Sequence, residues 1–232
     1  METICITGAS RGIGLGFARA YLEAGCRVFA CARNPMAQSL QELTSSFRDQ
    51  LEIIEVDVSD SASVDRGCAE VRRRADRLDI LINNAGTAPR PDEQNIEDVD
   101  EEAIDRVFNV NTLGPLRVTK ALFPLLRESD NGRVVMIGSS AGSISSQGGG
   151  RGVPYCVSKA ALNMLTRLLY FHCRDEGVAI TSLHPGWVRT DMGGESGALT
   201  VEESVSHMRE QIAALSADSP VYMDYKGEAM PW

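Results

Sequence analysis

The 232-residue chain carries 23 Lys and Arg against 32 Asp and Glu, which gives a formal net charge of −9 at pH 7. This acidic balance argues against general binding to nucleic acid or to an anionic membrane surface. Hydrophobic residues make up 43% of the sequence, enough for one sizeable core, yet no apolar run approaches the roughly 18 residues of a membrane span.

The six cysteines are scattered and show no Cys-x-x-Cys or Cys/His spacing, so we expect no metal site. Several lie in apolar segments that predict strands, as expected of buried thiols in a reducing compartment. The first predicted strand begins at the third residue, which leaves no room for a signal peptide, and we therefore expect a cytoplasmic protein.

The first predicted strand, Thr3–Thr7, is followed by a glycine-rich turn and then by helical spacing of apolar residues up to Gly25. Glycines in such a turn let the backbone approach a phosphate, and the free N–H groups at the helix N-terminus attract the anion. A tight turn without a ligand would have the same residues, but the strand–turn–helix context favours a dinucleotide site. The candidate cofactor-binding residues here are Gly8, Ser10, Arg11, Gly12, Ile13 and Gly14.

The residue after the second predicted strand, Cys26–Cys31, indicates which dinucleotide binds. A site selective for the unphosphorylated form places an acid there, on the ribose hydroxyls. This chain has no acid before Glu42 and has Arg33 instead, with Arg11 in the glycine turn. Two guanidinium groups converging on the ribose would accept a 2′-phosphate. The pattern predicts a preference for NADP(H), with NAD(H) as the alternative.

Two further predicted strands, Leu51–Val56 and Leu78–Ile82, end in polar residues. Asp57 can accept a hydrogen bond from an adenine amine, whereas Ser59 or Asp60 can cap the following helix, and both roles stay open. After the later strand comes Asn83-Asn84-Ala85-Gly86, where small residues allow a ligand to approach the backbone and asparagine side chains can tie neighbouring strands together.

The strand Arg133–Gly138 delivers two serines, and a glycine-rich loop, Ala141–Val153, leads to a long predicted helix. Tyr155 and Lys159 are four residues apart on that helix and therefore share one face. A nearby ammonium group is expected to lower the tyrosine pKa, which suits proton exchange between an alcohol and a carbonyl. A packed ring beside a solvated lysine is the alternative interpretation of the pair.

The last predicted strand, Val178–Leu183, runs into His184-Pro185-Gly186, and a short Gly-rich segment, Met192–Leu199, is a candidate lid. A helix over Thr200–Leu215 and a tail follow. The alternation of strands and helices predicts a single α/β domain over residues 1–232, a Rossmann-type doubly wound parallel sheet with its ligand crevice at the carboxyl edge. No ordered Ser/His/Asp set supports a hydrolase.

Taken in order, these motifs resemble the short-chain dehydrogenase/reductase family, and the glycine-rich loop and the chain ending resemble its compact carbonyl reductases. The resemblance implies a catalytic tetrad of Asn111, Ser139, Tyr155 and Lys159. Ser139 is favoured over Ser140 because Ile137-Gly138-Ser139-x-x-Gly142 matches the strand ending of the family. The further cofactor-binding residues that it implies are Val58, Asn84, Ala85, Gly86, Pro185, Gly186, Val188 and Thr190, together with Arg33, Asp57, Tyr155 and Lys159.

The same resemblance implies hydride transfer between nicotinamide and a small carbonyl or alcohol substrate, with Tyr155 exchanging the proton. Lys159 would hold the ribose, Ser139 would steady the oxyanion, and Asn111 would anchor a water-linked proton path. Helices near Thr112–Arg127 and Pro154–Glu176 imply a homodimer or homotetramer. A nucleotide-binding signalling or scaffold protein on the same fold is the main alternative; an epimerase or dehydratase would normally have a longer C-terminal region.

Overall fold

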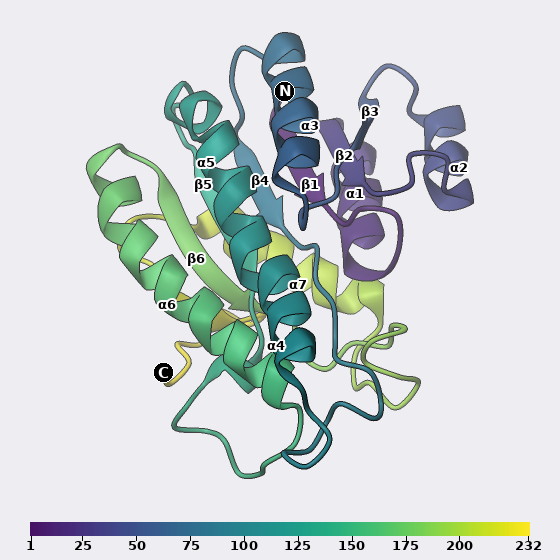
Figure 1. The fold of residues 1–232 in the computed structure, drawn as a ribbon. Helices are drawn as coiled ribbons and strands as arrows, with labels where there is room; N and C mark the ends of the chain where they lie inside the picture. Colours follow the sequence, from purple (N-terminus) through teal and green to yellow (C-terminus); the bar gives the residue numbers. More distant parts are fainter.

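A seven-stranded parallel sheet with the order β3-β2-β1-β4-β5-β6-β7 forms the centre of the computed structural model, which describes residues 1–232 (Figure 1). The strands are β1 (Thr3–Thr7), β2 (Arg27–Ala32), β3 (Leu51–Glu55), β4 (Ile80–Asn83), β5 (Arg133–Ile137), β6 (Ala179–His184) and β7 (Tyr222–Asp224). Every residue of β1 and β5 is buried, because helices cover both faces of the sheet. This explains why these strands read as continuous apolar runs without alternation.

Helices cover the sheet in two layers. One layer consists of α1 (Gly12–Glu23), α2 (Gln38–Ser46) and α7 (Val201–Ala214). The other consists of α3 (Ser61–Arg74), α4 (Glu101–Phe108), a π-helical turn (Asn109–Leu113), α5 (Gly114–Arg127) and α6 (Val153–Asp175). This confirms the predicted three-layer, doubly wound α/β fold. None of the helices combines the length and apolar character needed to cross a bilayer.

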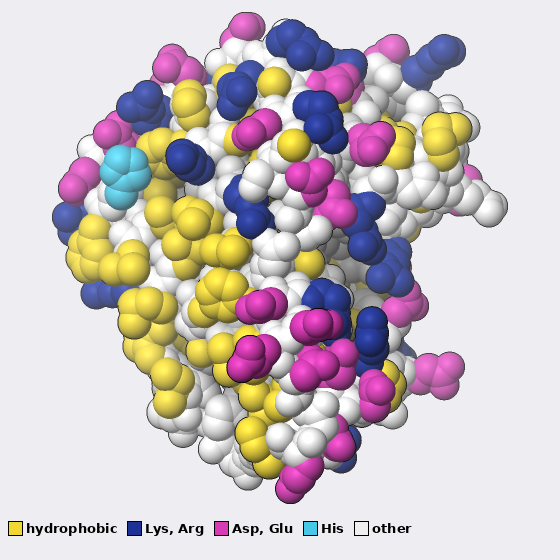
Figure 2. Space-filling view, viewed as in Figure 1, with side chains coloured by type: hydrophobic (Ala, Val, Ile, Leu, Met, Phe, Trp, Pro, Cys, Tyr) yellow, Lys and Arg dark blue, Asp and Glu magenta, His cyan; other side chains and the backbone are white.

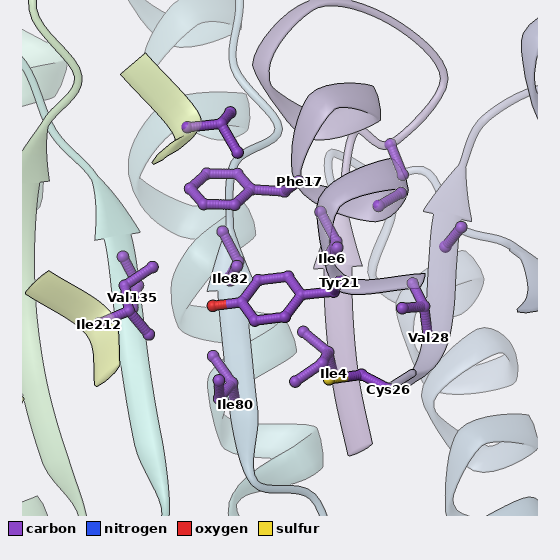
Figure 3. Close-up of a cluster of buried hydrophobic side chains, with 14 of the residues drawn as sticks. Ile4, Ile6, Phe17, Tyr21, Cys26, Val28, Ile80, Ile82, Val135 and Ile212 are labelled. Atoms are coloured by element: carbon purple, nitrogen blue, oxygen red, sulfur yellow. The ribbon is translucent and has the colours of Figure 1, made fainter. Parts of the chain in front are cut away.

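Each layer buries its own hydrophobic core against the sheet. In the first core, Phe17 and Tyr21 of α1 pack over Ile4 and Ile6 of β1, and Ile212 of α7 closes the cluster (Figure 3). The second core joins Cys5, Leu81 and Met136 of the sheet to residues of the opposite helices, which include Val64, Leu122 and Leu162. The two cores hold the carboxyl ends of the strands in fixed relative positions.

Side-chain caps explain several helix starts. Asp60 accepts a hydrogen bond from the Ala62 N–H at the start of α3, so the capping role that the sequence left open belongs to Asp60. Asp100 caps α4 by accepting from the Ala103 N–H. Thr200 and Glu203 form a reciprocal capping box at α7, which begins and ends within one residue of its predicted bounds.

The structure differs from the sequence-based expectation mainly near the end of the chain. The tail contains β7, which pairs with only three residues of β6 and is too short to carry a periodic signal. The predicted strand Leu78–Ile82 is shifted to Ile80–Asn83, and Asn111 lies in a π-helical turn between α4 and α5. The loop expected over Ala141–Val153 begins with a 3₁₀ turn, Ser140–Gly142.

Candidate active site

The ends of β1 and β4 meet at the point where the strand order reverses, which is the usual ligand position in such sheets. The Thr7 hydroxyl accepts hydrogen bonds from the N–H groups of Asn84 and Ala85, both at 3.0 Å. The Asn84 side chain in turn donates to the carbonyls of Thr7 at 2.9 Å and Gly8 at 3.2 Å. The predicted tie between neighbouring strands is therefore made by Asn84, which joins the segment after β4 to the glycine turn after β1.

The glycine turn is packed so closely that side chains cannot replace its hydrogens. A Cβ on Gly14 would lie 2.3 Å from the Gly8 carbonyl oxygen, and Gly8 itself has a φ of +66°. The first turn of α1 has no side-chain cap, so its N–H groups have no partner from a capping residue. Ser10 and Ile13 lie in this turn, and Ser39 donates to the Ser10 carbonyl at 2.6 Å. The free amides and small residues fit a dinucleotide pyrophosphate.

The two arginines expected at the ribose have different carboxylate neighbours. Arg11 forms a 2.7 Å ion pair with Asp191, a residue that the sequence analysis did not select. Arg33 is exposed at the end of β2 and lies near Asp57. Burial opposes ionisation of Asp57, but hydrogen bonds from Ser59 and the charge of Arg33 outweigh it and lower its pKa. Arg11 is thus paired across the glycine turn with Asp191, whereas Arg33 lies near Asp57, and their convergence on a ribose stays a prediction.

The segment after β6 approaches the glycine turn. The Thr190 methyl carbon would lie 3.5 Å from a Cβ on Gly12, so this segment crosses the glycine turn. The Thr190 hydroxyl accepts from the Gly193 N–H at 3.1 Å, and the Pro185 carbonyl accepts from buried Ser204 at 2.7 Å. Gly186 has a φ of +81°, and Val188 forms a β-bridge with Leu199. Val58 packs against Gly114. All three belong to the expected cofactor site.

The four residues expected to be catalytic come from three elements and meet at the carboxyl edge. Ser139, two residues after the end of β5, lies close enough to Tyr155 on α6 for its side chain to lower the pKa of the phenol. Lys159, one helical turn further, is 5% exposed, and its ammonium nitrogen lies 5.6 Å from the centre of the Tyr155 ring. A Cβ on Gly86 would lie 3.4 Å from the Asn111 side-chain oxygen and 4.0 Å from the Lys159 nitrogen. This contact joins the tetrad to the end of β4.

Asn111 is completely buried in the π-helical turn, and both polar atoms of its side chain form hydrogen bonds. Its amide donates to the Ser158 hydroxyl at 3.0 Å and to the Thr87 carbonyl at 2.9 Å, and its oxygen accepts from the Thr87 N–H at 2.8 Å. The extra residue of a π-helical turn changes the direction of the side chains that follow it, which is why such turns often mark functional sites. Asn111 thereby fixes α6 relative to the segment after β4.

The acid–base properties of the pair differ from the expectation. Burial raises the pKa of Tyr155, while the nearby Ser139 side chain opposes the rise. Burial also lowers the pKa of Lys159 to about 8, and the amine donates a 2.8 Å hydrogen bond to the Ile137 carbonyl. The expected lowering of the Tyr155 pKa is therefore wrong for this structure, because burial removes hydration from the phenolate and is the largest cause of the raised pKa. At pH 7 the phenol carries its proton and most of the amine is charged.

Two residues that sequence reasoning missed hold the serine turn. His184 accepts a hydrogen bond from the Ser140 N–H at 3.3 Å, and burial lowers the pKa of this histidine, so the neutral ring acts as the acceptor. The Tyr222 hydroxyl donates to the Ser139 carbonyl at 2.7 Å. The Ser140 side chain is exposed, whereas Ser139 lies beside Tyr155, which supports the choice of Ser139. His184 could have been found from its position at the end of a predicted strand.

A family model described as short chain dehydrogenase matches residues 2–199 of the chain. The chain belongs to the short-chain dehydrogenase family. C-signal of Myxococcus xanthus is 42% identical over 156 residues, which cover 67% of this chain and 93% of that protein. The structure of an NADPH-bound carbonyl reductase from chicken fatty liver matches with a TM-score of 0.92 at 35% identity and covers 100% of this chain and 99% of that chain.

The carbonyl reductase Sniffer of D. melanogaster matches with a TM-score of 0.94 at 30% identity, and the match covers 100% of both chains. These likenesses confirm the predicted place of this short-chain dehydrogenase among the compact carbonyl reductases of the family. The protein is thus an oxidoreductase by family. Its glycine turn and its Asn/Ser/Tyr/Lys set occupy the carboxyl edge of the sheet, where both sequence and topology predict the nucleotide to bind.

Proposed function

We propose that this short-chain dehydrogenase is an NADPH-dependent reductase of a small carbonyl substrate, with Tyr155 as the general acid. The observation that carries the proposal is the grouping of Ser139, Tyr155 and Lys159 beside the end of β4. The Tyr155 phenol carries its proton at neutral pH, as an unshifted tyrosine also would, and this is the form that reduction of a carbonyl requires. The whole of residues 1–232 would serve as one nucleotide-binding domain in the cytoplasm.

The residues divide the work of binding the cofactor and protonating the substrate. The N–H groups of the glycine turn would hold the pyrophosphate, and Lys159 would hold the nicotinamide ribose. The reduced nicotinamide, when bound, supplies the hydride. Tyr155 donates its proton to the carbonyl oxygen as that oxygen gains negative charge, and the Ser139 hydroxyl donates a hydrogen bond to the same atom. Asn111 keeps Ser158 and Thr87 in register, and with Lys159 it would anchor the path that returns a proton to Tyr155.

The absence of an acid after β2 supports a preference for the phosphorylated cofactor. Arg33 is exposed there, close enough to Asp57 to lower the pKa of that carboxyl, and Arg11 lies in the glycine turn beside Asp191. A 2′-phosphate would gain charge-assisted hydrogen bonds from a guanidinium group, whereas an unphosphorylated ribose would find no carboxylate directly after the strand. The NADPH that is bound by the chicken carbonyl reductase agrees with this assignment.

A second candidate is a nucleotide-binding signalling protein in which turnover is secondary, and the likeness to C-signal favours it. A protein that only binds nucleotide has no need of proton-transfer groups, so the complete Asn/Ser/Tyr/Lys set supports the reductase. The deciding experiment follows NADPH consumption with a panel of ketones, aldehydes and quinones, using the Tyr155→Phe variant as the control. Turnover by the parent that the variant lacks supports the reductase, and no turnover with any compound supports the signalling protein.

An exposed apolar face on α6 supports assembly into a homodimer or homotetramer. Val157, Met164, Leu168 and Phe171 recur at helical spacing and are between 44% and 62% exposed. The hydrophobic side chains on the left of Figure 2 cover this part of the molecule. Four large apolar residues on one helical face lose contact with water when a second copy covers them, and this contribution favours association.

A further inference from the structure

Residues from distant parts of the chain hold the turn that carries Ser139. From α6, the Asn163 side chain donates to the Gly142 carbonyl at 3.1 Å and accepts from the Ser182 hydroxyl at 2.6 Å. A Cβ on Gly142 would lie 2.7 Å from the Lys159 carbonyl, so the turn rests directly on the helix that carries Tyr155. This side of the turn is rigid because its partners are buried.

The opposite side of the turn is held by the last residues of the chain. Tyr222, only 2% exposed, donates its hydroxyl to the Ser139 carbonyl at 2.7 Å. Its ring centre lies 5.4 Å from that of Trp232. The Trp232 carbonyl accepts from the Ser145 N–H at 2.9 Å and from the Ser145 hydroxyl at 2.8 Å. Tyr222 thus holds the loop at Ser139, and Trp232 holds it six residues later, at Ser145.

A tight turn brings Trp232 back to this loop. The Asp224 carboxylate accepts from the N–H groups of Lys226 at 2.9 Å and Glu228 at 3.0 Å, and Gly227 has a φ of +87°. The chain then runs antiparallel to β7, where the Met230 N–H donates to the Tyr222 carbonyl at 3.0 Å. Figure 1 marks this end of the chain with C, below the sheet. The hairpin brings the Tyr222 hydroxyl and the Trp232 main-chain oxygen to the same loop.

We propose that Tyr222–Trp232 is a positioning clamp for Ser139, and that carbonyl reduction depends on this clamp although none of its side chains touches the reacting atoms. The inference rests on the proposed function, since it assumes that Ser139 donates to the substrate oxygen. The Ser139 hydroxyl has to face Tyr155 and the substrate together, and a shift of about 1 Å in such a group can cost up to about 100-fold in rate. Locking the serine backbone from two sides keeps the hydroxyl in place.

The first test is the Tyr222→Phe variant, which keeps the ring and removes only the hydrogen bond to Ser139. We expect kcat for carbonyl reduction to fall about tenfold, with the NADPH dissociation constant and the substrate KM each within about twofold of the parent. Tyr170→Phe is the matched control, because the Tyr170 hydroxyl also donates to a backbone carbonyl, that of Ala217 at 3.0 Å, away from the site. A purely structural role would give the two variants the same kcat.

The second test addresses the ring of Trp232. Trp232→Ala removes the contact with Tyr222, whereas Trp232→Phe retains an aromatic ring in the same place. We expect kcat to fall in Trp232→Ala and to stay close to that of the parent in Trp232→Phe. An unchanged kcat in both Tyr222→Phe and Trp232→Ala, with Tyr155→Phe inactive, would overturn the clamp and leave the reductase standing. Retained turnover in Tyr155→Phe would overturn the proposed function itself.

Discussion

The ammonium nitrogen of Lys159 lies 5.6 Å from the centre of the Tyr155 ring, but it donates its 2.8 Å hydrogen bond to the Ile137 carbonyl at the end of β5. The lysine thereby joins α6 to the sheet at the same edge where the phenol meets Ser139. Burial raises the pKa of Tyr155 and lowers that of Lys159 to about 8, so it favours the neutral form of both side chains. At neutral pH the Tyr155 hydroxyl therefore holds a proton that it can donate.

Replacing Tyr155 by Phe should remove the general acid and leave the nucleotide site intact. We expect turnover to fall by about 10³-fold, within the range attributed to proton transfer, while the NADPH dissociation constant stays within about twofold. Steady-state kinetics and a fluorescence titration of NADPH measure the two quantities. Turnover close to that of the parent would show that Tyr155 has no such role.

Replacing Arg33 by Ala should weaken NADPH much more than NADH. A charge-assisted hydrogen bond contributes about 1.5–3 kcal/mol, which corresponds to roughly 10- to 150-fold in the NADPH dissociation constant. Arg19→Ala is the control, because it removes the same charge from an exposed position on α1. Equal losses for both nucleotides in Arg33→Ala would reject Arg33 as the reader of the 2′-phosphate.

The buried amine of Lys159 should make the stability of the fold depend on pH. Burial lowers its pKa from 10.5 to about 8, so between these values the unfolded chain binds more protons than the folded one, and the free energy of unfolding rises with pH. This contribution is lost as the pH falls toward 8. From pH 8 to 9.5 the parent should gain up to about 2 kcal/mol relative to Lys159→Met, at about 1.4 kcal/mol per pH unit.

Urea unfolding of the parent and of Lys159→Met at several pH values measures this gain. The buried cysteines and Tyr155 titrate in both proteins, so their contributions largely cancel in the difference. Lys120→Met serves as the control, because it makes the same substitution at an exposed position on α5, away from the site. A difference for Lys159→Met that does not change with pH would contradict the lowered pKa of Lys159.

The apolar face of α6 should be covered in the assembled protein. Leu168 is 62% exposed in the isolated chain, and Leu168→Glu would place a carboxylate in the interface. We expect the dissociation constant of the oligomer to rise at least about tenfold, measured by light scattering after size-exclusion chromatography. Met36→Glu, at a 71% exposed position outside this face, should assemble like the parent. If both variants had the same dissociation constant as the parent, any interface would lie elsewhere on the surface.

Local patterns in the sequence were sufficient for the architecture and for the choice of most candidate residues. Apolar runs bounded by glycine and polar residues predicted six of the seven strands of the sheet, with three of them displaced by one or two residues: Cys26–Cys31, Leu78–Ile82 and Val178–Leu183. The glycine turn and the Asn84–Gly86 segment could be recognised because the backbone itself imposes them: a Cβ at Gly14 would meet the Gly8 carbonyl. Steric limits of this kind act between residues close together in the chain, so the sequence shows them directly.

Other properties of the protein were decided only by the tertiary structure. The Arg11–Asp191 pair joins residues on two different loops, and the contacts of Tyr222 and Trp232 with the serine loop join the end of the chain to a segment far earlier in the sequence. The direction of the Tyr155 pKa shift depends on how much water the folded chain removes from the phenol and from Lys159. Periodicity and motif spacing describe neighbours along the chain, whereas desolvation and long-range hydrogen bonds exist only once the sheet and both helical layers have come together.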